Sequence, residues 1–127
     1  MRYDIKLQKG VKIVVVGDIH EHEEQVDKLL EEVKPDENTR LVSVGDIYDK
    51  GFGRDVAESI TDKLKPLVES GVAHVIQGNH ELTSVRWAKR QRKMTEQLRW
   101  WDKQPLSIIF TFPNRSRVTV VHGGVLP

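Results

Sequence analysis

Three short β-branched segments, each followed by a glycine and then a helical pattern, constrain the fold of this chain most strongly. Residues 11–16 are almost wholly apolar and stop at Gly17; residues 40–44 stop at Gly45, and residues 72–76 end shortly before a third glycine. Apolar runs of this length are typical of strands buried on both faces of a parallel sheet. Strands that alternate with helices predict an α/β fold with a largely parallel sheet.

The segments between and after these strands have their own patterns. Apolar residues recur at helical spacing from residue 26 to 33 and again from 56 to 64, which predicts two helices. We expect a third helix, polar and basic, from about residue 83 to 101. Residues 107–112 and 117–121 are expected to form two strands joined by a turn.

Composition limits the class of protein. The chain has 127 residues, which is enough for one domain, and its formal net charge is +1. It has no cysteine, so a disulfide framework and a thiolate metal site are excluded. The first ten residues lack the apolar stretch of a signal peptide, and no run approaches the length of a membrane span. We therefore expect a cytoplasmic protein.

Polar residues follow each of four predicted strands. In open α/β sheets ligands bind at the carboxyl ends of the strands, and carboxylate, amide and imidazole groups suit divalent cations such as Mn²⁺, Fe or Zn²⁺. Two such cations about 3.5–4 Å apart can promote displacement at phosphorus. The four segments are Gly17-Asp18-Ile19-His20, Gly45-Asp46-Ile47-Tyr48-Asp49, Gly78-Asn79-His80-Glu81 and His122-Gly123-Gly124.

These four motifs, in this order, resemble those of the calcineurin-like metallophosphoesterases, and most closely the bacterial and phage-like members of the phosphoprotein phosphatase branch. The resemblance implies a layered sandwich and two divalent metal ions, with Mn²⁺ the first expectation and Fe or Zn²⁺ as alternatives. By resemblance, the metal ligands are Asp18, His20, Asp46, Asn79 and His122.

The resemblance also implies roles for residues beside the metals. His80 would protonate the leaving oxygen, and Asp49 would hydrogen-bond to His80 and favour its imidazolium form. Lys50 stands where a phosphate-binding arginine is usual, and Arg54 is a possible substitute. Glu81 would support its turn from behind.

Besides Lys50, the chain departs from the family pattern at two further places. Glu21 stands where glycine is usual, and the most economical interpretation is an acid at a helix start. The sequence also ends at Pro127, whereas the family continues with more strands, another arginine and a final metal-binding histidine. We therefore expect residues 1–127 to be a single metallophosphoesterase domain truncated after the His-Gly-Gly motif, its N-terminal two-thirds, completed by a missing segment or another chain.

The segment from residue 82 to 103 has two interpretations. It holds seven Lys/Arg against two Asp/Glu, and three tryptophans lie among them. Basic residues mixed with aromatics can bind nucleic acid. Because Trp87, Met94, Leu98 and Trp101 recur at helical spacing, the favoured interpretation is an amphipathic helix with a buried stripe.

The expected function is metal-dependent hydrolysis of phosphate monoesters by a metal-bridging water, as in a serine/threonine protein phosphatase. The expected substrate is a phosphorylated protein or a small phosphoester, and no membrane partner is expected. Two alternatives stay open. The first is a phosphoesterase acting on dinucleoside polyphosphates or nucleic acid, and the second is a catalytically weak metal-binding module or partial chain.

Overall fold

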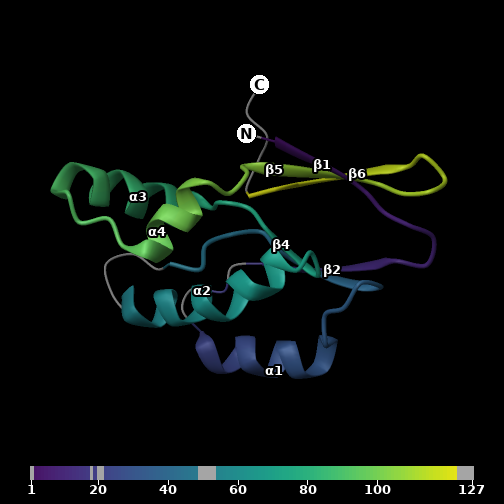
Figure 1. Ribbon diagram of the computed structural model, residues 1–127, viewed down its shortest axis with the longest axis horizontal. Coiled ribbons are helices and arrows are strands. Elements are labelled where there is room, and N and C mark those ends of the chain that lie inside the picture. The colour runs from purple at the N-terminus through teal and green to yellow at the C-terminus, as the bar shows by residue number, and fades with distance from the viewer. Residues whose placement is uncertain (1, 18, 20–21, 49–53, 123–127) are drawn as a thin grey trace.

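The computed structural model places the strands in two sheets and the helices beside them (Figure 1). Its described residues are 2–17, 19, 22–48 and 54–122, and every structural statement below concerns these. None of the helices in this part of the chain is both long and apolar enough to span a membrane.

The first sheet contains the three strands that the apolar segments predict. They are β2 (Lys12–Val16), β3 (Thr39–Ser43) and β4 (Ala73–Val75), in the order β2-β3-β4, and both pairings are parallel. The largely parallel α/β architecture is therefore confirmed. All three carboxyl ends lie at one edge of this sheet, where the polar motifs follow.

The second sheet combines parallel and antiparallel pairing. It consists of β1 (Arg2–Lys6), β5 (Ser107–Thr111) and β6 (Arg117–Val121), in the order β1-β5-β6. The β5–β6 hairpin is antiparallel, as expected from the turn between them, and β1 pairs with β5 in parallel. No strand was predicted over residues 2–6, because this segment is polar and its side chains are mostly exposed.

Four helices complete the described fold. They are α1 (Glu23–Val33), α2 (Arg54–Glu69), α3 (Asn79–Gln91) and α4 (Glu96–Asp102). In Figure 1, α1 and α2 lie on the side of the first sheet that faces away from the second sheet, and α3 and α4 lie beyond one end of the sheets.

Side-chain alternation on the central strand explains the layers. Leu41 belongs to a core cluster shared with helix residues such as Val26 and Ile60. The next residue, Val42, belongs to a second cluster with Phe110 and other residues of the second sheet. Because successive side chains of a strand point to opposite faces, β3 contributes to both cores. The result is a layered arrangement of sheet, sheet and helices.

Two details of the sequence-based expectation are wrong. The first predicted strand is not buried on both faces, since Val15 is 51% exposed. β2 lies at an edge of its sheet in the described residues, so it has one neighbouring strand instead of two. The basic helix is also divided in two: Arg92 adopts a left-handed conformation after α3, and Thr95 starts α4 by accepting a hydrogen bond from the Leu98 N–H.

Candidate active site

The loops that follow β3 and β4 touch each other at two glycines. Gly45 has φ +95°, and a Cβ added to it would lie 2.4 Å from the Gly78 nitrogen. A Cβ added to Gly78 would likewise lie 2.4 Å from Asp46 Oδ1. Asp46 itself has a left-handed backbone, with φ +55°. Only glycine fits at both contacts, so these residues bring the Asp46 motif against the start of α3.

Glu81 fastens these two loops together. Its carboxylate accepts hydrogen bonds from the backbone N–H groups of Asp46 at 2.6 Å, Gly78 at 2.8 Å and Tyr48 at 3.0 Å. Glu81 is fully buried, and burial raises its pKa more strongly than the three N–H donors lower it. The role of Glu81 is therefore structural: it holds the two loops in place.

The Asp46 carboxylate lies at the centre of the described site. Oδ1 accepts a hydrogen bond from the His80 backbone N–H at 3.0 Å. Oδ2 lies 3.0 Å from Nε2 of His122, and the Asp46 side chain is only 9% exposed. Residues that follow three different strands, β3, β4 and β6, thus meet at one carboxylate.

The orientation of His122 is set by a backbone carbonyl and directs its other ring nitrogen to the Asp46 carboxylate. Nδ1 lies 2.8 Å from the Val44 carbonyl oxygen, which can only accept, so Nδ1 carries the proton. In a neutral imidazole Nε2 is then also an acceptor, and it faces the Asp46 carboxylate at 3.0 Å. A divalent cation held by both atoms would satisfy the two acceptors. Metal-binding histidines usually donate their other N–H to a carbonyl in this way, so Asp46 and His122 fit a divalent cation.

His80 is held by a similar contact. Its Nδ1 lies 3.0 Å from the Tyr48 carbonyl and 3.9 Å from Asp46 Oδ1, and its side chain is 29% exposed. Because the carbonyl accepts, Nδ1 carries a proton and Nε2 is the nitrogen that can exchange a proton with a substrate. The expected hydrogen bond from the His80 ring to Asp49 stays a prediction, because Asp49 lies outside the described residues.

The other predicted site residues are placed only in part. Asn79 is exposed as the first residue of α3, where its backbone is fixed between Gly78 and His80. Arg54 begins α2, and nothing is described of its side chain. Among the described residues no group of three His, Cys, Asp or Glu is close enough to hold a metal ion. The remaining predicted residues, Asp18, His20, Glu21, Asp49 and Lys50, lie outside the described part of the chain.

Sequence reasoning missed two contributors, the backbone carbonyls of Val44 and Tyr48. Each accepts from the Nδ1 of a predicted site histidine and so sets which nitrogen faces the site. Every residue has a carbonyl, so no sequence signal could have identified these two.

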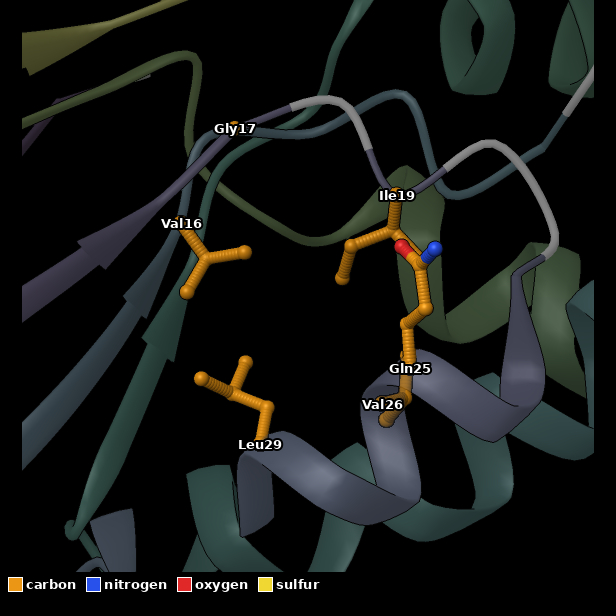
Figure 2. Close-up of a pocket in the computed structure, with 6 residues that line it drawn as sticks. All are labelled: Val16, Gly17, Ile19, Gln25, Val26 and Leu29. Carbon is orange, nitrogen blue, oxygen red and sulfur yellow. The ribbon is translucent and has the colours of Figure 1, made fainter. Parts of the chain in front are cut away.

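An apolar cavity lies next to the site, between β2 and α1 (Figure 2). Its volume is about 200 Å³. Ile19, the described residue between the predicted ligands Asp18 and His20, extends into it beside the Gln25 amide. With a single amide among apolar groups, this cavity is unsuited to a phosphate. Its lining residues are Val16, Gly17, Ile19, Gln25, Val26 and Leu29.

Two solved structures have a similar fold. The crystal structure of a candidate diadenosine tetraphosphatase is 25% identical, with a TM-score of 0.73, and the match covers 98% of this chain and 56% of that one. A serine/threonine phosphatase from Saccharomyces cerevisiae, with similarity to human phosphatase PP5, is 22% identical with a TM-score of 0.66, covering 98% of this chain and 42% of that one. This chain therefore spans about half the length of the structures it matches.

No curated protein sequence matches the chain. The family model for calcineurin-like phosphoesterases, in contrast, matches residues 11–126, which include all four motifs and both loops that Glu81 joins. This match covers far more than half of the 127 residues and agrees with the geometry at Asp46. The chain belongs to the calcineurin-like phosphoesterase family.

Proposed function

We propose that this chain provides the active site of a metal-dependent hydrolase of phosphate monoesters. The observation that supports the proposal most directly is the Asp46 carboxylate, which lies 3.0 Å from His122 Nε2 and accepts from the backbone of His80. Asp46 therefore lies beside both a candidate metal ligand, His122, and a candidate acid, His80, where the strands of a parallel sheet end.

The family generally uses two divalent cations, and we propose Mn²⁺ here, with Fe or Zn²⁺ as alternatives. When bound, the cations neutralise charge on the phosphate and lower the pKa of an attacking water. Asp46 would contact both cations. Asn79 and His122 would hold one, and Asp18 and His20 the other.

The chain's own residues supply the remaining chemistry. Water attacks phosphorus, the bond from phosphorus to the ester oxygen breaks, and that oxygen needs a proton. His80 would donate it from Nε2 in the imidazolium form that Asp49 is expected to favour, in which Nδ1–H stays bonded to the Tyr48 carbonyl at 3.0 Å. Glu81 keeps Asp46 and His80 at a fixed separation through its backbone contacts.

For the substrate we propose a phosphoserine or phosphothreonine residue in a protein, or a small phosphoester. Support comes from the motif Gly78-Asn79-His80-Glu81 and from the fold shared with the yeast serine/threonine phosphatase. The likeness to a candidate diadenosine tetraphosphatase supports dinucleoside polyphosphates as a second candidate. We also propose that a further segment or another chain completes the site, since the matched structures are about twice as long, and that the protein acts in the cytoplasm.

The test is hydrolysis of p-nitrophenyl phosphate with added Mn²⁺, together with the number of bound metal ions per chain. We expect turnover to fall at least about 100-fold in Asp46→Asn, which loses a charged ligand, and in His80→Asn, which loses the acid. Glu31→Gln is the matched control, because it also removes one carboxylate charge but at an exposed position of α1.

Undiminished hydrolysis in both variants would refute the proposed roles. A chain that binds one metal ion and does not hydrolyse the ester would instead favour the alternative of a catalytically weak metal-binding module, and a chain that binds none would favour a partial chain. Comparing a phosphopeptide with diadenosine tetraphosphate then separates the two substrate candidates.

A further inference from the structure

The basic segment divides into two structurally different parts. In α4, Leu98 and Trp101 are fully buried, as the amphipathic interpretation predicts. Trp87 in α3 is 39% exposed, so the expectation that it belongs to the same buried stripe is wrong. The division of the helix after Gln91 explains this, because the two halves no longer share one face.

One exposed stripe of α3 begins at the active site. Asn79, Thr83, Arg86 and Arg90 are all exposed and follow each other at spacings of three or four residues, which places them along one side of the helix. The helix rise puts Arg86 about 10 Å and Arg90 about 16 Å from Asn79 along the axis. In Figure 1, α3 extends away from the ends of the strands, so its stripe leads outward from the site.

Among the described residues, no ion pair neutralises the arginines of this stripe. The only acidic residue in α3 is Glu81, which is buried against the loops. Lys89 pairs with Asp102 at 3.1 Å, but no ion pair within the described residues involves Arg86 or Arg90. Two guanidinium groups one helical turn apart therefore offer sites for two successive anionic groups.

The aromatic residue between them narrows the choice of ligand. Trp87 lies next to Arg86 in sequence and on the His80 side of the stripe, with part of its surface open to solvent. An exposed ring among arginines suits a ligand that has both phosphates and flat bases, which is the chemistry of a single-stranded nucleic acid. An acidic peptide would use the charges but has no base to stack on the ring.

Resting on the proposed phosphoesterase function, we propose that α3 binds the strand of a single-stranded nucleic acid whose terminal phosphate enters the active site. Arg86 and Arg90 contact phosphates behind the terminal one, and Trp87 stacks on a base. This surface adds an oligonucleotide with a phosphorylated end to the substrate candidates of the proposed function. Asp46, His80 and their neighbours act on the terminal phosphate alone.

Binding is tested separately from catalysis with fluorescein-labelled hexathymidylate that has no terminal phosphate to hydrolyse. Fluorescence anisotropy is measured on the Mn²⁺-loaded chain over a series of salt concentrations. For Arg86→Gln combined with Arg90→Gln, we expect binding to weaken about tenfold. The slope of log K against log salt concentration should become shallower by about 1.4, for two lost phosphate contacts. Trp87→Ala should weaken binding about fivefold or more, and Trp87→Phe should restore most of it.

The matched control is Lys28→Gln combined with Arg117→Gln, which removes two exposed positive charges from α1 and β6. The control should leave binding unchanged, and both double variants should hydrolyse p-nitrophenyl phosphate normally. Equal weakening in the two double variants, or stronger binding of an acidic phosphopeptide than of the oligonucleotide, would overturn the inference. If the unsubstituted chain fails to hydrolyse p-nitrophenyl phosphate, the proposed function fails, while the anisotropy result still decides whether α3 binds the strand.

Discussion

Replacing Glu81 by glutamine tests whether one buried carboxylate holds the active-site loops together. The amide oxygen can replace Oε1, which accepts from Asp46 and Gly78 at 2.6 and 2.8 Å. The amide nitrogen then faces the Tyr48 N–H, which now donates to Oε2 at 3.0 Å. The amide N–H of glutamine and the Tyr48 N–H would then face each other, and the buried Tyr48 N–H would lose its acceptor. This should lower the free energy of unfolding by about 1–3 kcal/mol.

The pH dependence of this loss provides a second, independent check. Burial raises the pKa of Glu81 above its ordinary value of 4.5. A raised carboxyl pKa means that its contribution to stability is complete below pH 4.5 and is lost as the pH rises through the folded-state pKa. Glutamine has no such dependence. The destabilisation caused by Glu81→Gln should therefore be largest at acidic pH and should shrink as the pH rises.

The assay is urea unfolding at pH 5 and pH 8, followed by circular dichroism, for the native chain and Glu81→Gln. Glu31→Gln again serves as the control, because Glu31 is exposed on α1. A change below about 0.5 kcal/mol at both pH values, which is the range of an ordinary surface substitution, would refute the role given to Glu81. A destabilisation that grows with pH would contradict the direction of its pKa shift.

Three further perturbations have defined outcomes. Gly45→Ala should prevent normal folding, as followed by circular dichroism, because its Cβ would lie 2.4 Å from the Gly78 nitrogen at a φ of +95°. Gly71→Ala is the control: its φ of +84° is similar but no atom lies within 4 Å of the added Cβ, so it measures backbone strain alone. Burial lowers the pKa of His74 to about 4, so its contribution to stability is complete above pH 6.5 and is lost as the pH falls. In His74→Phe, the free energy of unfolding, measured with urea, should therefore depend less on pH between pH 4 and 6.5 than it does in the native chain. An unchanged pH dependence would contradict this. Adding Mn²⁺ should raise the melting temperature of the native chain by more than that of His122→Ala, which keeps the cation that Asp18 and His20 would hold; equal shifts by calorimetry would contradict the role given to His122.

Much of the fold is predictable because burial leaves a pattern in the sequence. β3 and β4 belong to apolar runs that stop at or shortly before a glycine, and most of their residues are buried. β1 leaves no such pattern, since it is polar and depends on hydrogen bonds to β5 instead of burial. The division between α3 and α4 was missed because Arg92 adopts a left-handed conformation that its residue type does not favour.

Site residues were predictable where chemistry requires a particular side chain. Asp46, His80 and His122 were identified by motif, and the structure brings them together. The distances among them were not predictable, because they depend on which backbone carbonyl each histidine meets. His122 meets the Val44 carbonyl at 2.8 Å, an interaction across 78 positions of sequence that no local pattern encodes.

The arrangement at α3 connects the site to the proposed binding surface through a single helix. Its first turn carries Asn79 and His80 toward the catalytic edge, and Glu81 fixes that turn to the Asp46 loop. Glu81 therefore also sets the position of the exposed stripe. A rigid helix that is held at its first turn cannot rotate its later turns independently. Glu81→Gln should therefore weaken both oligonucleotide binding and the hydrolysis of p-nitrophenyl phosphate. Substitutions at Arg86 and Arg90 should weaken oligonucleotide binding alone. Finding both effects after the arginine substitutions would mean that the stripe and the catalytic edge are not separable.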